Sequence, residues 1–412
     1  MRDTRLQFFL TLAMLGTVLP YVSVFFRDAG LSDRLVGTAF AIYGLASVLS
    51  PMLVTAVADR TNRPRRLLTL LNLFAGIILV LLSRGHGVGE VMTLWVCYCL
   101  VSVPIFPLLN GIFFAQQERR REAGLVEMPY HAARAWGTVG YVVVSLLLFP
   151  ALHYGMSLGG VLMAGGIVAG CAAVQALLLA DPRSPTAHVA EKLPAFAAAK
   201  ILLGRRHFAF TAAVICMCMA SQIHSAFYPV YLTERIKLAN QWLGQASNVA
   251  VAVEAVIIFS CGFLLRRIGI KRLLMFGIAA TALRMGLLAS THHVFIAIGT
   301  QVFHGLLILV IGVIPQALFN DHAGERFRHS VQGMLVMLTS AGQCLASFSA
   351  GFVAAYSLSA VFASAMGLCL ISAILVFYGF QEQPGAPIDG QGELAADTPA
   401  RTVTPDRVTV VP

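Results

Sequence analysis

Stretches of about 20 apolar residues recur along the chain between Leu6 and Phe380, and no other feature limits the possible folds as strongly. Such a stretch is long enough to cross the hydrocarbon layer of a bilayer as a helix, which pairs all its backbone polar groups internally. Hydrophobic residues make up 58% of the 412 positions and charged residues 12%, whereas charged residues form about a quarter of a soluble domain. The sequence therefore predicts an all-α membrane protein.

The apolar runs between charge clusters predict twelve transmembrane helices in two sets of six. The expected spans are residues 6–26, 35–57, 67–83, 91–114, 131–150 and 157–180, then 207–232, 244–265, 273–290, 294–317, 331–356 and 359–380. The tail is rich in Pro, Gly and Asp and is expected to be disordered. The predicted domains are an N-terminal six-helix half (1–180), a cytoplasmic central loop (181–206), a C-terminal six-helix half (207–380) and a disordered cytoplasmic tail (381–412).

The basic residues predict an orientation. If the N-terminus, the even-numbered connections and the tail share one side, that side holds 22 of the 29 Lys and Arg, and the other side holds five. Basic loops remain in the cytoplasm, so both termini are expected there, in a bacterial-type inner (plasma) membrane. The net charge of +10 follows from these loops, and it gives no reason to expect a nucleic-acid partner.

Two similar loops indicate an internal repeat. TAVADRTNRPRRLL (55–68) follows the second expected span, and GFLLRRIGIKRLL (262–274) follows the eighth. Aligning Asp59 with Arg266 gives an offset of 207 residues, about half of the chain. Parallel repeats of this kind occur in secondary transporters, where the two halves form one central site.

The first of these loops resembles the signature G-x-x-x-D-R-x-G-R-R of the major facilitator superfamily. Thr55 and Asn62 stand where that family usually has glycine. The resemblance implies a pseudo-symmetric twelve-helix fold and a gating loop on the cytoplasmic face. The candidate gating residues are Asp59, Arg60, Arg63, Arg65, Arg266, Arg267 and Lys271. A solvated loop that only sets the topology is the alternative.

Three ionisable residues deep in the second half are candidates for proton coupling. Glu254 is the one acid deep inside an expected span, and Arg284 and His304 lie at similar depth in the next two spans. Buried ionisable groups are costly in a membrane and usually serve function. We hypothesise that Arg284 holds Glu254 ionised in one state and releases it for protonation in another, with His304 sharing the proton. A static salt bridge is the alternative.

A basic excess with nearby aromatic side chains predicts the substrate class. An arginine binds a carboxylate through two parallel hydrogen bonds, and aromatic rings offer flat apolar surface. This combination suits a small carboxylate with an apolar body. The candidate substrate-binding residues are Arg134, Asn110, His224, Tyr228, Trp136 and Tyr21. Neutral histidines bonded between helices, a helix–helix contact for Asn110 and a snorkelling Arg134 remain alternatives.

The order acid, arginine and histidine in spans eight, nine and ten is similar to that of the lactose permease and phenylpropionate permease branch. RAWGTVGY at 134–141 and the segment 231–290 resemble phenylpropionate permeases in particular. The resemblance implies a proton symporter for an aromatic or other carboxylic acid. Asn110 and Leu307 replace two acids of the lactose permease pattern, which disfavours a galactoside. A sugar or nucleoside substrate, or export, remains an alternative.

Other classes of protein fit the sequence less well. It contains no H-E-x-x-H motif or similar nucleophile or metal set, so neither an intramembrane enzyme nor a metal or cofactor site is expected. A channel usually needs oligomeric symmetry or a re-entrant filter, and the loops are too short for a receptor's sensory domain. The expected partners are a small-molecule substrate, a proton and the lipid bilayer, and the chain is expected to act as a monomer.

Overall fold

Twelve helical segments are long and apolar enough to cross a membrane. The structure is a computed structural model that describes residues 2–61, 63–179, 195–205 and 207–380. Each predicted span corresponds to one of these segments, and the described residues contain no strand. The predicted all-α class with twelve spans is confirmed. Most of the predicted central loop and the whole predicted tail lie outside the described residues, although 195–203 form a short helix, α9 (Ala195–Leu203).

The first six spans, which we call the N-terminal half, contain two composite helices. In chain order they are α1 (Arg2–Val18) with α2 (Val22–Asp28), α3 (Asp33–Thr61), α4 (Pro64–Leu82), α5 (Val88–Ser102) with α6 (Ile105–Glu122), α7 (Tyr130–His153) and α8 (Leu158–Leu178). Both composite helices are interrupted by a turn that contains a proline, Pro20 between α1 and α2 and Pro104 between α5 and α6. Proline lacks the N–H that would continue the helical hydrogen bonds.

The last six spans, which we call the C-terminal half, are less regular. They are α10 (Phe208–Val230) with the π-helical turn η1 (Tyr231–Arg235), α11 (Trp242–Ile268), α12 (Ile270–Ser290), then α13 (Val294–Gly299), the 3₁₀ turn η2 (Thr300–Phe303), α14 (His304–Ile308), the π-helical turn η3 (Leu309–Val313), α15 (Ile314–Ala354) and α16 (Leu358–Gly379). The tenth span thus passes through four short segments into the start of α15. Such irregular turns are frequent at functional sites.

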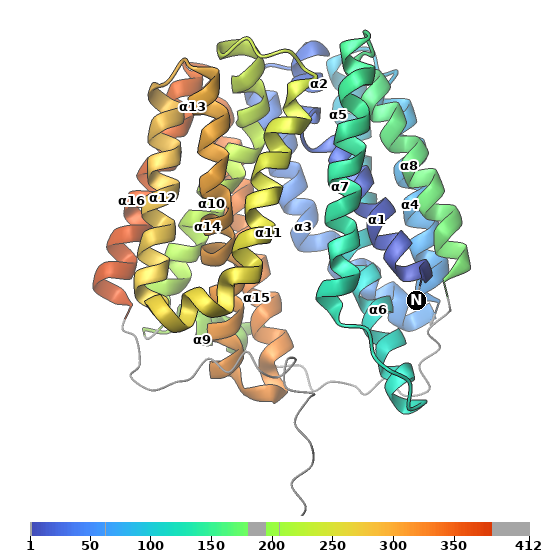
Figure 1. Cartoon of the computed structure of the whole chain (residues 1–412), viewed down its shortest axis with the longest axis vertical. Helices are drawn as coiled ribbons and strands as arrows, with labels where there is room; N and C mark the ends of the chain where they lie inside the picture. Colours follow the sequence, from blue (N-terminus) through green and yellow to red (C-terminus); the bar gives the residue numbers. More distant parts are fainter. Residues whose placement is uncertain (1, 62, 180–194, 206, 381–412) are drawn as a thin grey trace, which may run out of the picture. The chain divides into compact units, whose positions relative to one another are not determined.

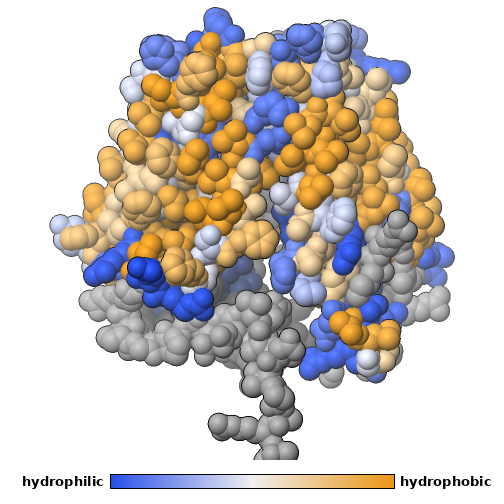
Figure 2. Space-filling model, viewed as in Figure 1, coloured by the Kyte–Doolittle hydropathy of each residue, from blue (hydrophilic) through white to orange (hydrophobic). Residues whose placement is uncertain are grey.

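The two halves contact each other chiefly through four helix pairs: α3 with α15, α7 with α11, and α10 with both α2 and α3. Figure 1 shows α7 and α11 beside each other at the centre of the bundle. The visible side of the molecule carries a broad hydrophobic band with hydrophilic residues toward both ends (Figure 2). This pattern matches a bundle whose middle faces lipid. We call the end that carries Arg63 and Arg119 to Arg121 the basic end.

The repeat is visible in the contacts at the basic end. The Arg65 guanidinium donates to the carbonyl oxygens of Leu177 and Leu179 (3.3 and 3.1 Å), where α8 ends. The Lys271 ammonium likewise donates to the carbonyl of Phe377 (3.0 Å) near the end of α16. The last carbonyls of a helix have no partner within the helix, and a cation is favourable there. Each basic residue therefore ties the third span of its half to the sixth.

The same offset of 207 residues returns at the opposite end. Gly30 follows α2 with a φ of +87°, and Lys237 follows η1 with a φ of +62°. Lys237 is the one non-glycine residue with positive φ in the described chain, and this left-handed conformation is uncommon for such a side chain. Two chain reversals of the same kind at equivalent positions support the repeat.

Close packing across the halves depends on small residues. A Cβ placed on Gly37 of α3 would lie 2.6 Å from the Cα of Gly351 on α15. On α11, a Cβ on Gly244 would lie 2.5 Å from the hydroxyl oxygen of Tyr21, which is fully buried. Without a hydrophobic driving force between spans, such backbone approach supplies much of the packing energy in membranes.

We expect Gly244→Val to destabilise the protein. The added side chain would overlap Tyr21, and overpacking costs about 1–3 kcal/mol. A thermal unfolding curve of the purified protein in detergent measures the effect as a lower midpoint. Gly262→Val is the matched control, because it lies on the same helix and an added Cβ there meets nothing within 4 Å. Equal midpoints for the two variants would contradict this account of the interface.

Candidate functional site

Two adjoining cavities lie in the middle of the bundle, where both halves supply the walls. One, of about 270 Å³, is lined by residues of α1, α7 and α11. The other, of about 220 Å³, also reaches α10, α12 and the tenth span. Leu19, Tyr141 and Val251 line both. A substrate in the joined space would touch both halves, as a site between two repeats requires.

The larger cavity brings a predicted arginine and the predicted acid together. Arg134 and Glu254 both line it, with Thr138 and Tyr141 beside Arg134 on α7. Thr138 is four positions after Arg134 and Tyr141 is three positions after Thr138, so all three project from one face of the helix. The Arg134 guanidinium lies 5.2 Å from the centre of the Phe106 ring, a distance at which the ring stabilises a cation.

Arg284 is fully buried at the second cavity and has nitrogen and oxygen partners. Its NH1 lies 3.2 Å from Nδ1 of His304, and its NH2 lies 2.9 Å from Nε2 of His224. The same NH2 donates to the side-chain oxygen of Gln301. We call Arg284, His224, His304 and Gln301 the Arg284 cluster. Within the described chain, no carboxylate oxygen lies within 4 Å of this guanidinium.

The 3₁₀ turn in the tenth span explains how Gln301 and His304 meet at one arginine. Gln301 lies within η2, and His304 directly follows it. A 3₁₀ helix has three residues per turn, so side chains three positions apart project in the same direction. Both side chains therefore point toward Arg284 on α12.

The hypothesised partners Glu254 and Arg284 are connected through His304. The Nε2 atom of His304 lies 3.7 Å from a carboxylate oxygen of Glu254, while its other ring nitrogen faces Arg284. No ion pair joins Glu254 directly to Arg284 among the described side chains. The structure therefore brings all three predicted coupling residues into one chain of contacts. That Arg284 holds Glu254 in one state and releases it in another stays a prediction.

The six predicted substrate-binding residues divide into two groups. Arg134, His224 and Tyr228 line the cavities, and the rings of His224 and Tyr228 stack with centres 4.5 Å apart. The other three do not line these cavities. Tyr21 packs against α11, Asn110 accepts a hydrogen bond from the hydroxyl of Tyr130 (3.2 Å), and Trp136 is 45% exposed on the outside of the bundle.

The candidate gating residues at the basic end are only partly described. The side chains of Asp59 and Arg60 lie outside the described part of the structure. Arg63 and Arg266 are exposed, and Arg267 is exposed with its guanidinium 5.8 Å from the ring centre of Phe263. Arg65 and Lys271 bind helix ends within their own halves, as described above. Gating by these residues stays a prediction.

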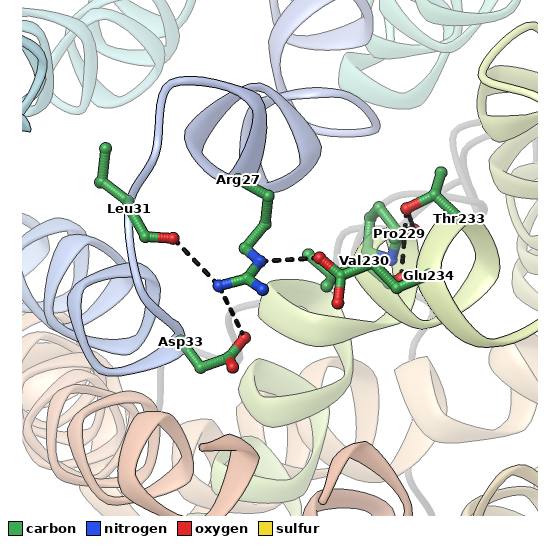
Figure 3. A network of polar contacts seen from close by, with 7 residues as sticks. All are labelled: Arg27, Leu31, Asp33, Pro229, Val230, Thr233 and Glu234. Atoms are coloured by element: carbon green, nitrogen blue, oxygen red, sulfur yellow. Dashed lines mark hydrogen bonds and ion pairs between the residues drawn. The ribbon is translucent and has the colours of Figure 1, made fainter. Parts of the chain in front are cut away.

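A polar network that the sequence did not single out joins the halves at the end opposite the basic end (Figure 3). Arg27 at the end of α2 donates from Nε to Glu234 of η1 at 2.7 Å. Its NH1 donates to the carbonyl of Leu31 (3.0 Å) and lies 3.4 Å from Asp33. Arg27 and Glu234 are separated by 207 residues, so they occupy equivalent positions in the two repeats.

Further hydrogen bonds join α7 and α11 toward the same end. Ser145 donates to the side-chain oxygen of Asn248 at 2.8 Å, and Gln245 donates to the Ser145 carbonyl at 3.2 Å. A ring nitrogen of His153 lies 3.3 Å from the side-chain oxygen of Gln241. The halves are therefore held together by polar contacts on the Arg27 side of the central cavities.

Twelve spans and two related halves, with cavities between them that hold charged side chains in largely apolar walls, are typical of a membrane transporter. A model of the MFS_1 like family matches residues 3–364, and the chain belongs to this family. It is therefore a major facilitator transporter and not an enzyme, and it is a multi-pass protein of the inner membrane.

Several relatives are described as transporters of small molecules. "Putative nucleoside transporter YegT" of Escherichia coli is 28% identical over 269 residues, which is 63% of this chain and 60% of that protein. The nucleoside permease NupG of the same organism is 23% identical, over 82% of this chain and 83% of the relative. "Probable 3-phenylpropionic acid transporter" of E. coli is 23% identical, over 70% and 74%.

A crystal structure of the nucleoside transporter NupG has the same fold. It superposes with a TM-score of 0.80 at 19% identity, covering 92% of this chain and 99% of that structure.

Proposed function

We propose that the chain is a proton-coupled nucleoside permease that works by alternating access. The observation that carries the proposal is that Arg134 and Glu254 face one cavity from opposite halves. A carboxylate accepts hydrogen bonds from sugar hydroxyls, and a guanidinium donates to sugar or base oxygens. The rings of Tyr141 and Tyr228 supply flat surface for a base in the adjoining cavity. Two of the relatives are described as nucleoside transporters.

An aromatic carboxylate is the second candidate substrate, and one observation favours it. The buried Arg284 has no described carboxylate within 4 Å, and a buried arginine is stabilised by an anion. A substrate carboxylate reaching the Arg284 cluster would supply that charge. One relative is described as a 3-phenylpropionic acid transporter.

The proposed transport cycle uses the two ends of the bundle differently. We place the basic end and both termini in the cytoplasm, because basic loops are retained there. In this orientation the Arg27–Glu234 pair closes the outer side, and the cavities open toward the cytoplasm when the halves separate at the basic end. Arg65 and Lys271 keep each half rigid during that movement. We propose that a single chain completes the cycle.

Competition for uptake tests the substrate class. In energised inner-membrane vesicles, excess nucleoside is expected to block uptake of radiolabelled uridine, and 3-phenylpropionate is not. Arg134→Gln should weaken uridine uptake by about tenfold, as expected from losing a charge-assisted hydrogen bond. Arg84→Gln is the control, since Arg84 is exposed in the loop after α4. Uptake of labelled 3-phenylpropionate that nucleosides do not block would favour the second candidate and contradict the first.

A further inference from the structure

The Arg284 guanidinium faces one ring nitrogen of each of two histidines. Its NH1 is 3.2 Å from Nδ1 of His304, and its NH2 is 2.9 Å from Nε2 of His224. A guanidinium has five N–H donors and no acceptor, and it keeps its charge in proteins. Both facing nitrogens must therefore accept, which means that neither carries a proton.

This geometry excludes a protonated form of either histidine while the contacts last. An imidazolium carries N–H on both nitrogens, so a protonated His304 or His224 would set N–H against N–H and put two cations in contact. Arg284 is fully buried, so water would not screen that repulsion. The neutral His304 instead carries its hydrogen on Nε2, the atom 3.7 Å from Glu254.

We propose that Arg284 is a positioning residue that keeps His304 and His224 neutral, with the ring nitrogens that face it unprotonated, and directs the Nε2–H of His304 toward Glu254. The coupling proton is then carried by Glu254 and not by the histidines. This assignment rests on the proposed proton coupling. It places the coupling proton on Glu254 alone, whereas the sequence hypothesis has Glu254 and His304 share it. It also makes the His304–Glu254 contact one between a neutral donor and a carboxylate.

The groups around the two residues fit these roles. His304 on α14 faces Arg284 of α12 and Glu254 of α11, and His224 of α10 lies on the far side of the guanidinium. Glu254 shares its cavity with Arg134 and Tyr141 of α7. Glu254 is the one carboxylate in this set, so it alone changes from charged to neutral by taking a proton.

The distance between His304 and Glu254 leaves room for a response to that proton. At 3.7 Å the Nε2 and Oε2 atoms are too far apart for a hydrogen bond. An ionised Glu254 attracts the Nε2–H strongly when the two approach, and a protonated Glu254 does so less. The charge of Glu254 thus controls the position of His304, although His304 itself exchanges no proton. Because His304 forms part of the wall of the substrate cavity, that wall moves with it.

Ring ¹⁵N signals of the histidines test the assignment without any substrate. The full chain, labelled with ¹⁵N-histidine and held in lipid nanodiscs, is measured from about pH 5 to about pH 8, the range in which an ordinary histidine changes charge. The His304 signal is identified by its loss in His304→Gln. We expect a bare Nδ1 and a protonated Nε2 over the whole range. A His304 ring that becomes doubly protonated within this range would overturn the proposal.

Arg284 variants test the cause. In Arg284→Met the donor is gone, so His304 is expected to take up a proton in this range, while Arg284→Lys keeps a donor and should preserve the bare Nδ1. Gln301→Leu is the matched control, because it removes a partner of Arg284 but leaves its contact with His304. Identical His304 spectra in Arg284→Met and the wild type would contradict the proposal. Failure of nucleoside transport would leave these spectra unchanged, so the two proposals fail separately.

Discussion

Glu254→Gln is expected to abolish accumulation of nucleoside against its gradient while exchange of labelled for unlabelled nucleoside continues. Glutamine keeps the size and one oxygen of the carboxylate but cannot take up a proton. A transporter with this change can still bring substrate across in either direction, because exchange needs no net proton movement. Uphill uptake requires the proton step, so the internal concentration should not rise above the external one.

The measurement compares both activities in the same proteoliposomes, with an imposed pH gradient for accumulation and none for exchange. Glu90→Gln is the matched control, since Glu90 accepts a hydrogen bond from the backbone of His86 at 3.1 Å in a loop contact outside both cavities. This control should behave as the wild type. Full accumulation by Glu254→Gln would remove Glu254 from the coupling mechanism.

Arg27→Glu is expected to open the outer side of the bundle. The change removes the 2.7 Å contact with Glu234 and places a third carboxylate beside Glu234 and Asp33. The pair is partly exposed, with side-chain exposures of 28% and 39%, so its attraction is worth at most about 1 kcal/mol. The new repulsion adds to this loss. A total of about 1–2 kcal/mol shifts the equilibrium between the closed and the open outer side about 5- to 30-fold toward the open form.

Spin labels at positions 154 and 295 would report this opening as a longer distance in the variant. Tyr154 follows α7, Phe295 lies in α13, and both are more than 80% exposed. Arg84→Glu is the control for added negative charge at an exposed loop position. The charge-swapped double variant of Arg27 and Glu234 should recover part of the short distance, since Asp33 still repels the new glutamate. An unchanged distance in Arg27→Glu would show that the pair does not hold the halves.

The twelve spans were predictable because membrane burial leaves a direct mark on composition. In a bilayer each apolar run must hydrogen-bond its own backbone N–H and C=O groups as a helix. Length and hydropathy are therefore enough to locate each span in the sequence. Glu254, Arg284 and His304 were found for the same reason, since charged groups in hydrocarbon are rare.

The partners of these residues were not predictable, because they depend on how helices face one another. His304 lies between Glu254 and Arg284 only because a 3₁₀ turn places it there beside Gln301. Gln301 was overlooked, although a polar residue three positions before His304 in an apolar span indicates a shared face. The hydrogen bond from the Tyr130 hydroxyl to Asn110 likewise depends on how α6 and α7 face each other.

The Arg27–Glu234 pair left a signal in the sequence that went unused. Arg27 is one of the five basic residues on the less basic side, and Glu234 is an acid near the end of the seventh span. The two are separated by the same 207 residues as Asp59 and Arg266. Opposite charges at equivalent positions of a two-fold repeat can pair when both lie close to its axis. Applying the repeat offset to every charge, and not only to one loop, would have made this pair a candidate.

Proton movement driven by substrate tests the central claim most directly. The purified chain is reconstituted in liposomes with a pH-sensitive dye inside, and uridine is added outside with no imposed gradient. The account predicts acidification of the interior that depends on uridine, is absent with Glu254→Gln and is collapsed by a protonophore. Uridine entry without any proton movement, or proton movement with 3-phenylpropionate and not with nucleosides, would contradict a proton-coupled nucleoside permease.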